Sequence, residues 1–158
     1  MPYVKRETLS LDFIAGLIVG EGTFYWTRAP SGKIPGFGLR MHVRDKWLVT
    51  AVRDTLGLKK RVYEYIHNNR HYAFLIVREI GSLKNIIIPL IYPRLAGYKR
   101  LQFLEWFQGF YNPEAAEGYQ FFPNALRRQF PDLCDEKTLA EMIKREKLIL
   151  LDSNYPLL

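Results

Sequence analysis

A short apolar segment that carries two glycines and ends in an acid constrains this 158-residue chain most strongly. The apolar residues between positions 11 and 18 have helical spacing, and Ser10 or Thr8 can cap the start of the helix. Gly16 and Gly20 lie four residues apart and so share one helix face. Glycines flank Glu21 on both sides, which favours termination there. The segment predicts a helix that another helix can approach closely and that presents Glu21 at its end.

After this helix the hydrophobic period changes to the alternation that is typical of strands. The expected strands are residues 23–28, 37–44, 61–67 and 70–78. Residues 29–36 are rich in Gly, Pro and Ser, so we expect a loop there. Asn68-Asn69 separates the last two strands and predicts a tight hairpin turn.

Further helices are expected between and after these strand pairs. Asp45 can cap a helix that Gly57 closes, and Ser82 can cap a helix that ends around Pro93. Residues 97–110 and 138–150 have amphipathic spacing. The order predicts an α+β fold in which a four-stranded antiparallel sheet carries its helices on one face. We expect one domain over residues 1–158, with a core at about 9–110 and a C-terminal helical extension at about 111–158.

The first helix and its end carry a resemblance to a known family. Ile14-Ala15-Gly16-Leu17-Ile18-Val19-Gly20-Glu21-Gly22 resembles the nonapeptide that names the LAGLIDADG homing endonucleases. The strand after the motif and the αββαββα order also resemble that family. Two positions depart from the common pattern: Val19 stands where an acid is frequent, and Glu21 stands where Asp is common. The resemblance implies a site-specific, metal-dependent DNA endonuclease of the kind encoded in introns.

Only one copy of the motif is present, which implies a homodimer, since members with two motifs act as monomers. The expected contacts lie along the motif helix, at Phe13, Ala15, Gly16 and Gly20. Two helices packed there bring two Glu21 carboxylates together, and such carboxylates repel each other unless a cation lies between them. The resemblance implies Mg²⁺, which Mn²⁺ or Ca²⁺ can replace, bound by Glu21 and Gly20.

The resemblance also implies polar groups around the scissile phosphates. Asp45 is the expected second acid, and its alternative role is that of a helix N-cap. Lys99 is the expected basic catalytic residue because an ammonium can polarise water or neutralise a phosphate. The alignment leaves Tyr98 and Arg100 as alternatives, and both basic residues could simply solvate the start of a helix.

DNA recognition is expected on the sheet face opposite the helices, where a strand pair can enter the major groove. Alternation places basic and aromatic side chains on that face, although such alternation also occurs in simple sheet packing. The expected DNA-binding residues are Tyr25, Thr27, Arg28, Lys33, Arg40, His42, Arg44, Arg61, Tyr63, Tyr65, Arg70, Tyr72 and Arg78. An eight-residue strand spans about 26 Å, or roughly eight base pairs, so a dimer covers on the order of twenty near-palindromic base pairs.

Composition agrees with a polyanionic partner. The formal net charge is +7, and the single cysteine excludes an intrachain disulfide or a cysteine zinc cluster. The longest apolar run is far shorter than the roughly 18 residues that span a bilayer, and residues 1–6 lack a signal-peptide pattern. We therefore expect a soluble intracellular protein without a membrane partner, in an organelle or a prokaryotic cytoplasm.

Two alternatives to a nuclease remain open at this point. The same fold could serve as an RNA maturase that binds intron RNA, or as a DNA-binding protein that has lost catalysis. The retained acid at position 21 favours the nuclease.

Overall fold

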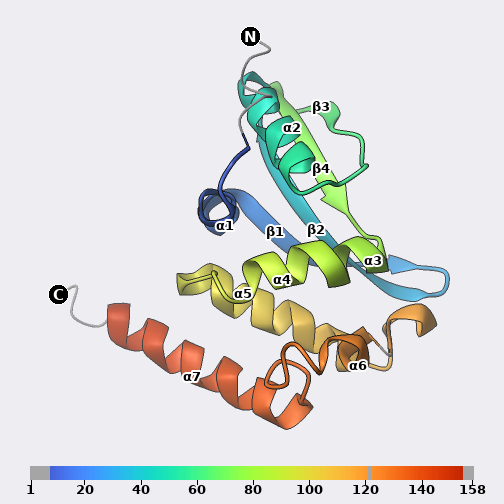
Figure 1. Cartoon of the computed structure of the whole chain (residues 1–158), viewed down its shortest axis with the longest axis vertical. Helices are drawn as coiled ribbons and strands as arrows, with labels where there is room; N and C mark the ends of the chain where they lie inside the picture. The colour runs from blue at the N-terminus through green and yellow to red at the C-terminus, as the bar shows by residue number, and fades with distance from the viewer. Residues whose placement is uncertain (1–7, 121, 155–158) are drawn as a thin grey trace. The chain divides into compact units, whose positions relative to one another are not determined.

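The computed structural model describes residues 8–120 and 122–154 (Figure 1). Residues 1–6, where the sequence lacks a signal-peptide pattern, lie outside the described part. The chain divides into two compact units, each described separately below. Within the described residues, the first unit comprises 8–23 and 36–94, and the second comprises 24–35 with 95–154.

The strands form one four-stranded sheet, as predicted, and their order in it is β1-β2-β4-β3. Their bounds are β1 Gly22–Ala29, β2 Gly32–His42, β3 Tyr63–His67 and β4 Arg70–Val77. β4 pairs antiparallel with both β2 and β3, so Arg40 and Tyr63 both lie opposite Phe74. The predicted Asn68-Asn69 turn is confirmed, because φ is 50° and 63° at the two residues, the left-handed values that a tight hairpin of this kind needs.

Three details of the predicted strands are wrong. The expected loop at 29–36 is mostly strand, because only residues 30 and 31 separate β1 from β2. β2 ends at His42, and the next three residues form a 3₁₀ turn, η2 Val43–Asp45. Residues 61, 62 and 78 flank β3 and β4 instead of lying within them.

The first unit buries one face of β2 and β4. Phe37, Leu39, Leu75 and Val77 are at most 1% exposed on that face. Helix α2 Lys46–Thr55 contacts β4 and contributes buried residues to the same core (Figure 1). The alternation that predicted an apolar inner face and a polar outer face is therefore confirmed for these two strands.

Helix α1 Leu11–Glu21 begins and ends as predicted. Ser10 Oγ accepts a hydrogen bond from the Phe13 N–H at 3.1 Å, which caps the first turn. At the other end, a Cβ on Gly22 would lie 2.6 Å from the Ile18 side chain, so the chain can turn into β1 only with glycine there.

The helical segment before Pro93 differs from the prediction at its start. It comprises α3 Ile80–Ser82, a π-helical turn Leu83–Ile87 and α4 Ile88–Ile91. Ser82 is therefore a helical residue, not the N-cap, and its hydroxyl donates to the Glu79 carboxylate. Pro89 lacks the N–H that a continuous α-helix needs, which accounts for the local change to π geometry beside it.

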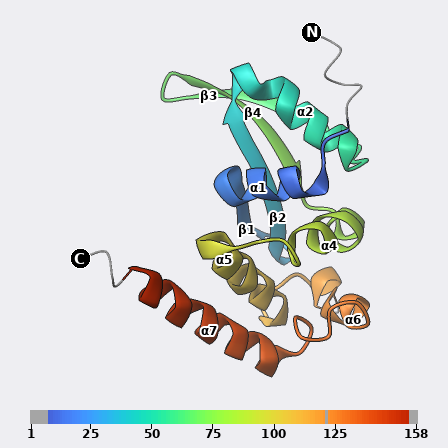
Figure 2. The ribbon, with the colours of Figure 1, turned by 60° about the vertical axis from the view of Figure 1, so that its left-hand side comes forward.

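The second unit is built around an aromatic core. Helix α5 Gly97–Gln108 packs side by side with α7 Glu136–Asn154 (Figure 2). The predicted apolar stripe of α5 is buried, including Leu101, Leu104 and Phe107. Asp135 caps α7 by accepting from the Thr138 N–H at 3.0 Å, which places the start slightly before the predicted residue 138. The remaining short helices are the 3₁₀ turns Gly109–Tyr111 and Glu117–Tyr119 and the helix α6 Phe122–Leu126.

Two tryptophans join β1 to α5 within this unit. The Trp26 Nε1–H donates to the Trp106 carbonyl at 2.9 Å, and the Trp106 Nε1–H donates to the Tyr25 carbonyl at 3.0 Å. The ring centroids of Trp26 and Phe110 are 4.9 Å apart. Trp26 therefore lies on the inward face of β1.

Candidate nucleic-acid interface and acidic site

Glu21 is the last residue of α1 and is exposed. Its carboxylate is close enough to Arg40 to contribute to the raised pKa of that guanidinium. The largest cause of this raised pKa is the hydrogen bond that Arg40 donates to Tyr65 Oη, at 3.2 Å. The end of the motif helix therefore presents its acid beside the basic outer face of the sheet.

One face of α1 is left uncovered by the residues that the structure describes. Gly16 and Gly20 are exposed, and a Cβ built at either glycine meets no atom within 4 Å. Phe13 is 48% exposed. Ala15 departs from the expected interface, because it is 3% exposed and packs inside its own unit with Ile14 and Ile18. The helical turn of about 100° per residue directs Ala15 away from the glycine face.

The outer face of β2, β4 and β3 is a ladder of basic and aromatic side chains. Arg40 lies opposite Phe74, and His42 lies opposite Tyr72, which itself lies opposite Tyr65. The Tyr65 and Tyr72 ring centroids are 5.4 Å apart. The predicted residues of these three strands that share this face are Arg40, His42, Tyr63, Tyr65, Arg70 and Tyr72.

The Arg40 guanidinium is held in place at this surface. Its carbon lies 4.6 Å from the centroid of the Tyr72 ring, and one of its nitrogens donates to Tyr65 Oη. Cation–π contact and hydrogen bonding restrict the rotamers of a long side chain. Arg40 is consequently oriented before any partner arrives.

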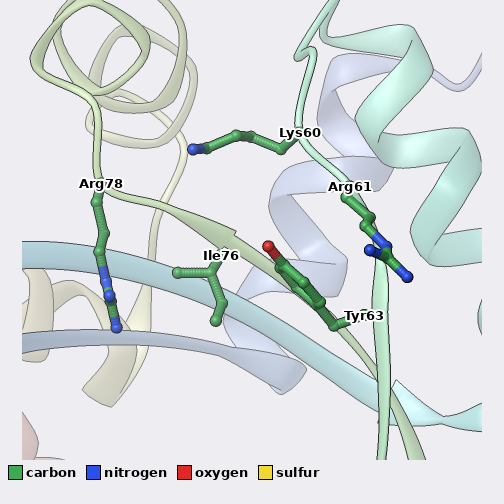
Figure 3. Close-up of a pocket in the computed structure, with 5 residues that line it drawn as sticks. All are labelled: Lys60, Arg61, Tyr63, Ile76 and Arg78. Carbon is green, nitrogen blue, oxygen red and sulfur yellow. The ribbon is translucent and has the colours of Figure 1, made fainter.

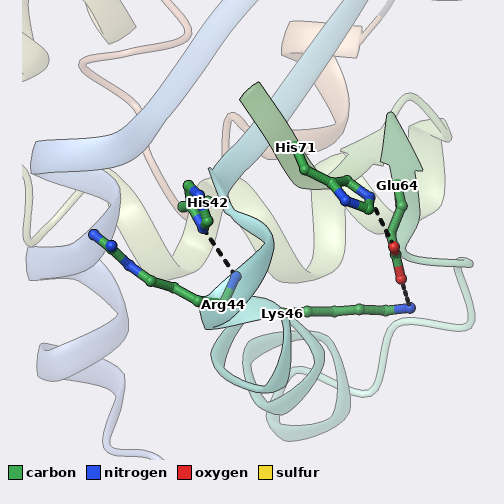
Figure 4. Close-up of polar contacts among 5 residues, drawn as sticks. All are labelled: His42, Arg44, Lys46, Glu64 and His71. Carbon is green, nitrogen blue, oxygen red and sulfur yellow. Dashed lines mark hydrogen bonds and ion pairs between the residues drawn. The ribbon is translucent and has the colours of Figure 1, made fainter. Parts of the chain in front are cut away.

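Alternation along the strand predicted Arg44 on the outer face, but Arg44 lies beyond the end of that strand. β2 ends at His42, and Arg44 belongs to the 3₁₀ turn that follows. The His42 Nδ1 accepts from the Arg44 N–H at 3.1 Å, which closes this turn (Figure 4). Both side chains remain exposed.

On the opposite face of the β3–β4 hairpin, the Glu64 carboxylate contacts both Lys46 and His71. Its carboxylate accepts from Lys46 and lies 2.9 Å from the His71 Nε2 (Figure 4). The Lys46 ammonium, first, and His71 hold the pKa of Glu64 below its ordinary value of 4.5. This cluster ties the hairpin to the start of α2.

Asp45 occupies the N-cap position of α2, but its side chain makes no capping hydrogen bond. It is half-buried, which leaves the role of a second acid as a prediction. Among residues 8–120 and 122–154, no group of three or more His, Cys, Asp and Glu side chains could hold a metal ion.

Four predicted DNA-binding residues lie on the β1–β2 hairpin of the second unit. Tyr25 is half-buried and Thr27 is exposed. Arg28 and Lys33 both pair with the Glu114 carboxylate, at 3.8 and 3.2 Å. A phosphate contact from either cation would have to compete with this carboxylate.

The three alternatives for the predicted catalytic position lie in the first turn of α5. Lys99 is half-buried in the first turn of the helix. Tyr98 is 63% exposed. Arg100 donates to the Glu146 carboxylate on α7 at 2.9 Å, so this arginine links two helices of its own unit.

Sequence reasoning missed a basic pocket at one end of the outer face. Its volume is about 390 Å³, and Lys60, Arg61, Tyr63, Ile76 and Arg78 line it (Figure 3). Arg61, Tyr63 and Arg78 were expected at the DNA, whereas Lys60 and Ile76 were not. The signal was present in the sequence as the basic run at positions 59–61 directly before β3.

Within the part of the chain that the structure describes, no helix combines the length and apolar character required to cross a membrane.

No protein-family model matches the sequence. Solved homing endonucleases nevertheless resemble the structure. I-TnaI has a TM-score of 0.51 and 20% identity, over 87% of this chain and 99% of its own. I-SmaMI, bound to an uncleaved DNA target in the presence of calcium ions, has a TM-score of 0.54 and 18% identity.

The I-SmaMI match covers 87% of this chain and 44% of that chain. I-LtrWI, a LAGLIDADG homing endonuclease bound to target DNA, matches with a TM-score of 0.49 and 21% identity, over 89% of this chain and 44% of its own. The chain thus spans less than half the length of I-SmaMI and I-LtrWI. Its strand order, its motif helix and the likenesses to I-TnaI and I-SmaMI agree: the chain has the fold of the homing endonucleases.

Proposed function

We propose that the chain is a LAGLIDADG homing endonuclease that cuts double-stranded DNA at a long, near-palindromic site. The observation that carries this proposal is the placement of Glu21. An exposed carboxylate ends a helix whose glycine face is open, and it lies beside the basic outer face of the sheet. DNA held on that face would bring phosphates to the acid.

We propose that the working unit is a homodimer joined along α1. Phe13 is half-exposed on this helix, and Gly16 and Gly20 have free space above them. A two-fold contact along such a face brings backbones close together and places two copies of Glu21 side by side. The near-palindromic symmetry of the target follows from the symmetry of the dimer.

The donor set at the end of α1 fits a hard divalent cation such as Mg²⁺. The Glu21 carboxylate and the Gly20 carbonyl are oxygen ligands, and the second copy would contribute the same pair. When bound, the metal would activate water and stabilise the leaving oxygen. The calcium ions in the I-SmaMI complex support a divalent metal, and Mn²⁺ or Ca²⁺ are expected to occupy the same ligands.

The remaining residues of the chain would bind and orient the DNA. Arg40 is held by Tyr65 and Tyr72 in a fixed orientation, which suits bidentate contact with guanine. Lys99 would neutralise charge on a phosphate, and Asp45 would orient water through a hydrogen bond.

Plasmid cleavage tests the proposal. With Mg²⁺ and a plasmid that carries the intron-free target locus, we expect the wild type to produce linear DNA. Glu21→Gln keeps the shape of the side chain and removes its charge, so this variant should bind the plasmid and leave it uncut. Asp54→Asn removes an exposed acid elsewhere in the same unit, one that pairs with the adjacent Arg53, and this variant should cut normally.

Binding without cleavage by the wild type would refute the nuclease and leave a DNA-binding protein of the same fold. Preferential binding of intron RNA over the duplex target would instead indicate a maturase.

A further inference from the structure

The pocket at the end of the outer face concentrates positive charge. Three of its five lining residues, Lys60, Arg61 and Arg78, are cations, and none is acidic. Lys60 has an ion-pair partner in Glu79 at 4.0 Å, at the limit of such a contact, and Glu79 does not line the pocket. A cleft lined by charges of one sign focuses their field and attracts anions.

The floor of the pocket is apolar and belongs to the sheet. Tyr63 and Ile76 lie on the same outer face as Arg40, because Tyr63 and Arg40 both lie opposite Phe74 and Ile76 is two residues further along β4. Figure 3 shows Lys60 extending from the segment before β3 toward the side where Arg78 follows the end of β4. A phosphate at the cations would leave its sugar against the Tyr63 ring and Ile76.

The position of the pocket along the sheet matches the spacing of duplex DNA. From Phe74, opposite Arg40, to Arg78 is four residues along the chain of β4. At roughly 3.3 Å per residue this is about 13 Å, or about four base steps of 3.4 Å. A duplex that follows the strands therefore passes Arg40 and the Arg78 end of the pocket about four base pairs apart.

We propose that this pocket binds one phosphodiester group of the DNA backbone in each half-site, about four base pairs from the base pair that Arg40 contacts. This assignment rests on the proposed DNA-binding function and adds Lys60 to the residues that carry it. The contact positions the duplex on the sheet and carries no sequence information, because every nucleotide has the same phosphate. Arg40 reads a base, and the pocket sets the register.

Single neutral linkages can test this assignment directly. A duplex selected from a random library by binding to this chain is synthesised with one methylphosphonate at each backbone position in turn. We expect the wild type to lose affinity at one phosphate per half-site about four base pairs from the base whose preference Arg40→Gln alters. The double variant Lys60→Gln/Arg78→Gln should no longer distinguish that linkage from an ordinary phosphate.

The salt dependence of binding gives an independent measurement. Each phosphate contact that is lost should reduce the slope of log K against log salt by about 0.9. The matched control Lys59→Gln/Lys84→Gln removes the same charge from the same unit without touching the pocket. The control should retain the wild-type interference pattern, and thermal unfolding should show that all variants are folded.

The outcomes separate the two proposals. If the pocket variant keeps the wild-type interference pattern and matches the control in its salt slope, the pocket assignment is wrong while DNA binding stands. If the wild type binds no duplex DNA, the proposed function and the pocket assignment fall together.

Discussion

A substitution at Gly16 should stabilise the single chain and weaken the affinity between two chains. The residue lies in the middle of α1, it is exposed, and a Cβ added there meets nothing within 4 Å. Replacing an exposed helical glycine by alanine stabilises a helix by about 0.8–1.0 kcal/mol. For a chain of this size, that gain should raise Tm by about 2–4 °C.

The affinity of the dimer should fall, whereas the stability of the single chain rises. If α1 packs against its own copy through Gly16, any added side chain overpacks the contact twice, at about 1–3 kcal/mol for each copy. The sum is roughly 2–6 kcal/mol, which raises the dimer dissociation constant about 30-fold or more. Gly16→Gln combines a good helix former with a side chain too large for close helix contact.

Two measurements on the same variants decide the matter. Urea unfolding at protein concentrations below the dimer dissociation constant reports the single chain, and sedimentation equilibrium reports the dimer. Gly81→Gln is the matched control, since Gly81 is also an exposed helical glycine with no atom within 4 Å of an added Cβ. A Gly16→Gln chain that dimerises as tightly as Gly81→Gln would refute packing through α1.

Two further predictions concern stability. Gly109→Ala should destabilise the chain by about 1–3 kcal/mol in urea unfolding, because the new Cβ would lie 2.4 Å from Trp26 Nε1 in the packed second unit; unchanged stability would show that the ring can shift freely. Glu64→Gln should destabilise the chain at neutral pH, because Lys46 and His71 favour the ionised carboxylate and lower its pKa. A lowered pKa contributes stability that is complete above the ordinary value of 4.5 and is lost as pH falls through the folded-state pKa, so the two chains should become equally stable in acid; a difference that persists there would indicate a packing effect.

Local chemistry made much of this fold predictable. Ser10, the Asn68-Asn69 turn and the alternation through Leu39 and Arg40 act over a few residues, and each is confirmed. The strand ends were less predictable, because they depend on pairing between distant segments. The backbone of Lys33, within the expected loop, exchanges hydrogen bonds with Glu114 and Ala116, more than eighty residues away.

The candidate site also has some features that local sequence predicts and others that depend on the fold. The position of Glu21 at a helix end follows from the flanking glycines and is predictable. The burial of Ala15 and the engagement of Arg100 by Glu146 depend on which neighbours the fold supplies. The pocket around Lys60 and Arg78 joins two segments that only the sheet brings together.

The positions of the tryptophans allow the fluorescence of each unit to be followed separately. Trp47 is 51% exposed on α2 in the first unit, whereas in the second the Trp26 indole donates to the Trp106 carbonyl and the two ring centroids are 6.4 Å apart. An indole in water emits at longer wavelength than one packed among other rings. Trp47→Phe would leave a fluorescence spectrum, and a coupled-chromophore signal in near-ultraviolet circular dichroism, that belong to the second unit alone. Stopped-flow traces of the two proteins would then time the folding of each unit separately.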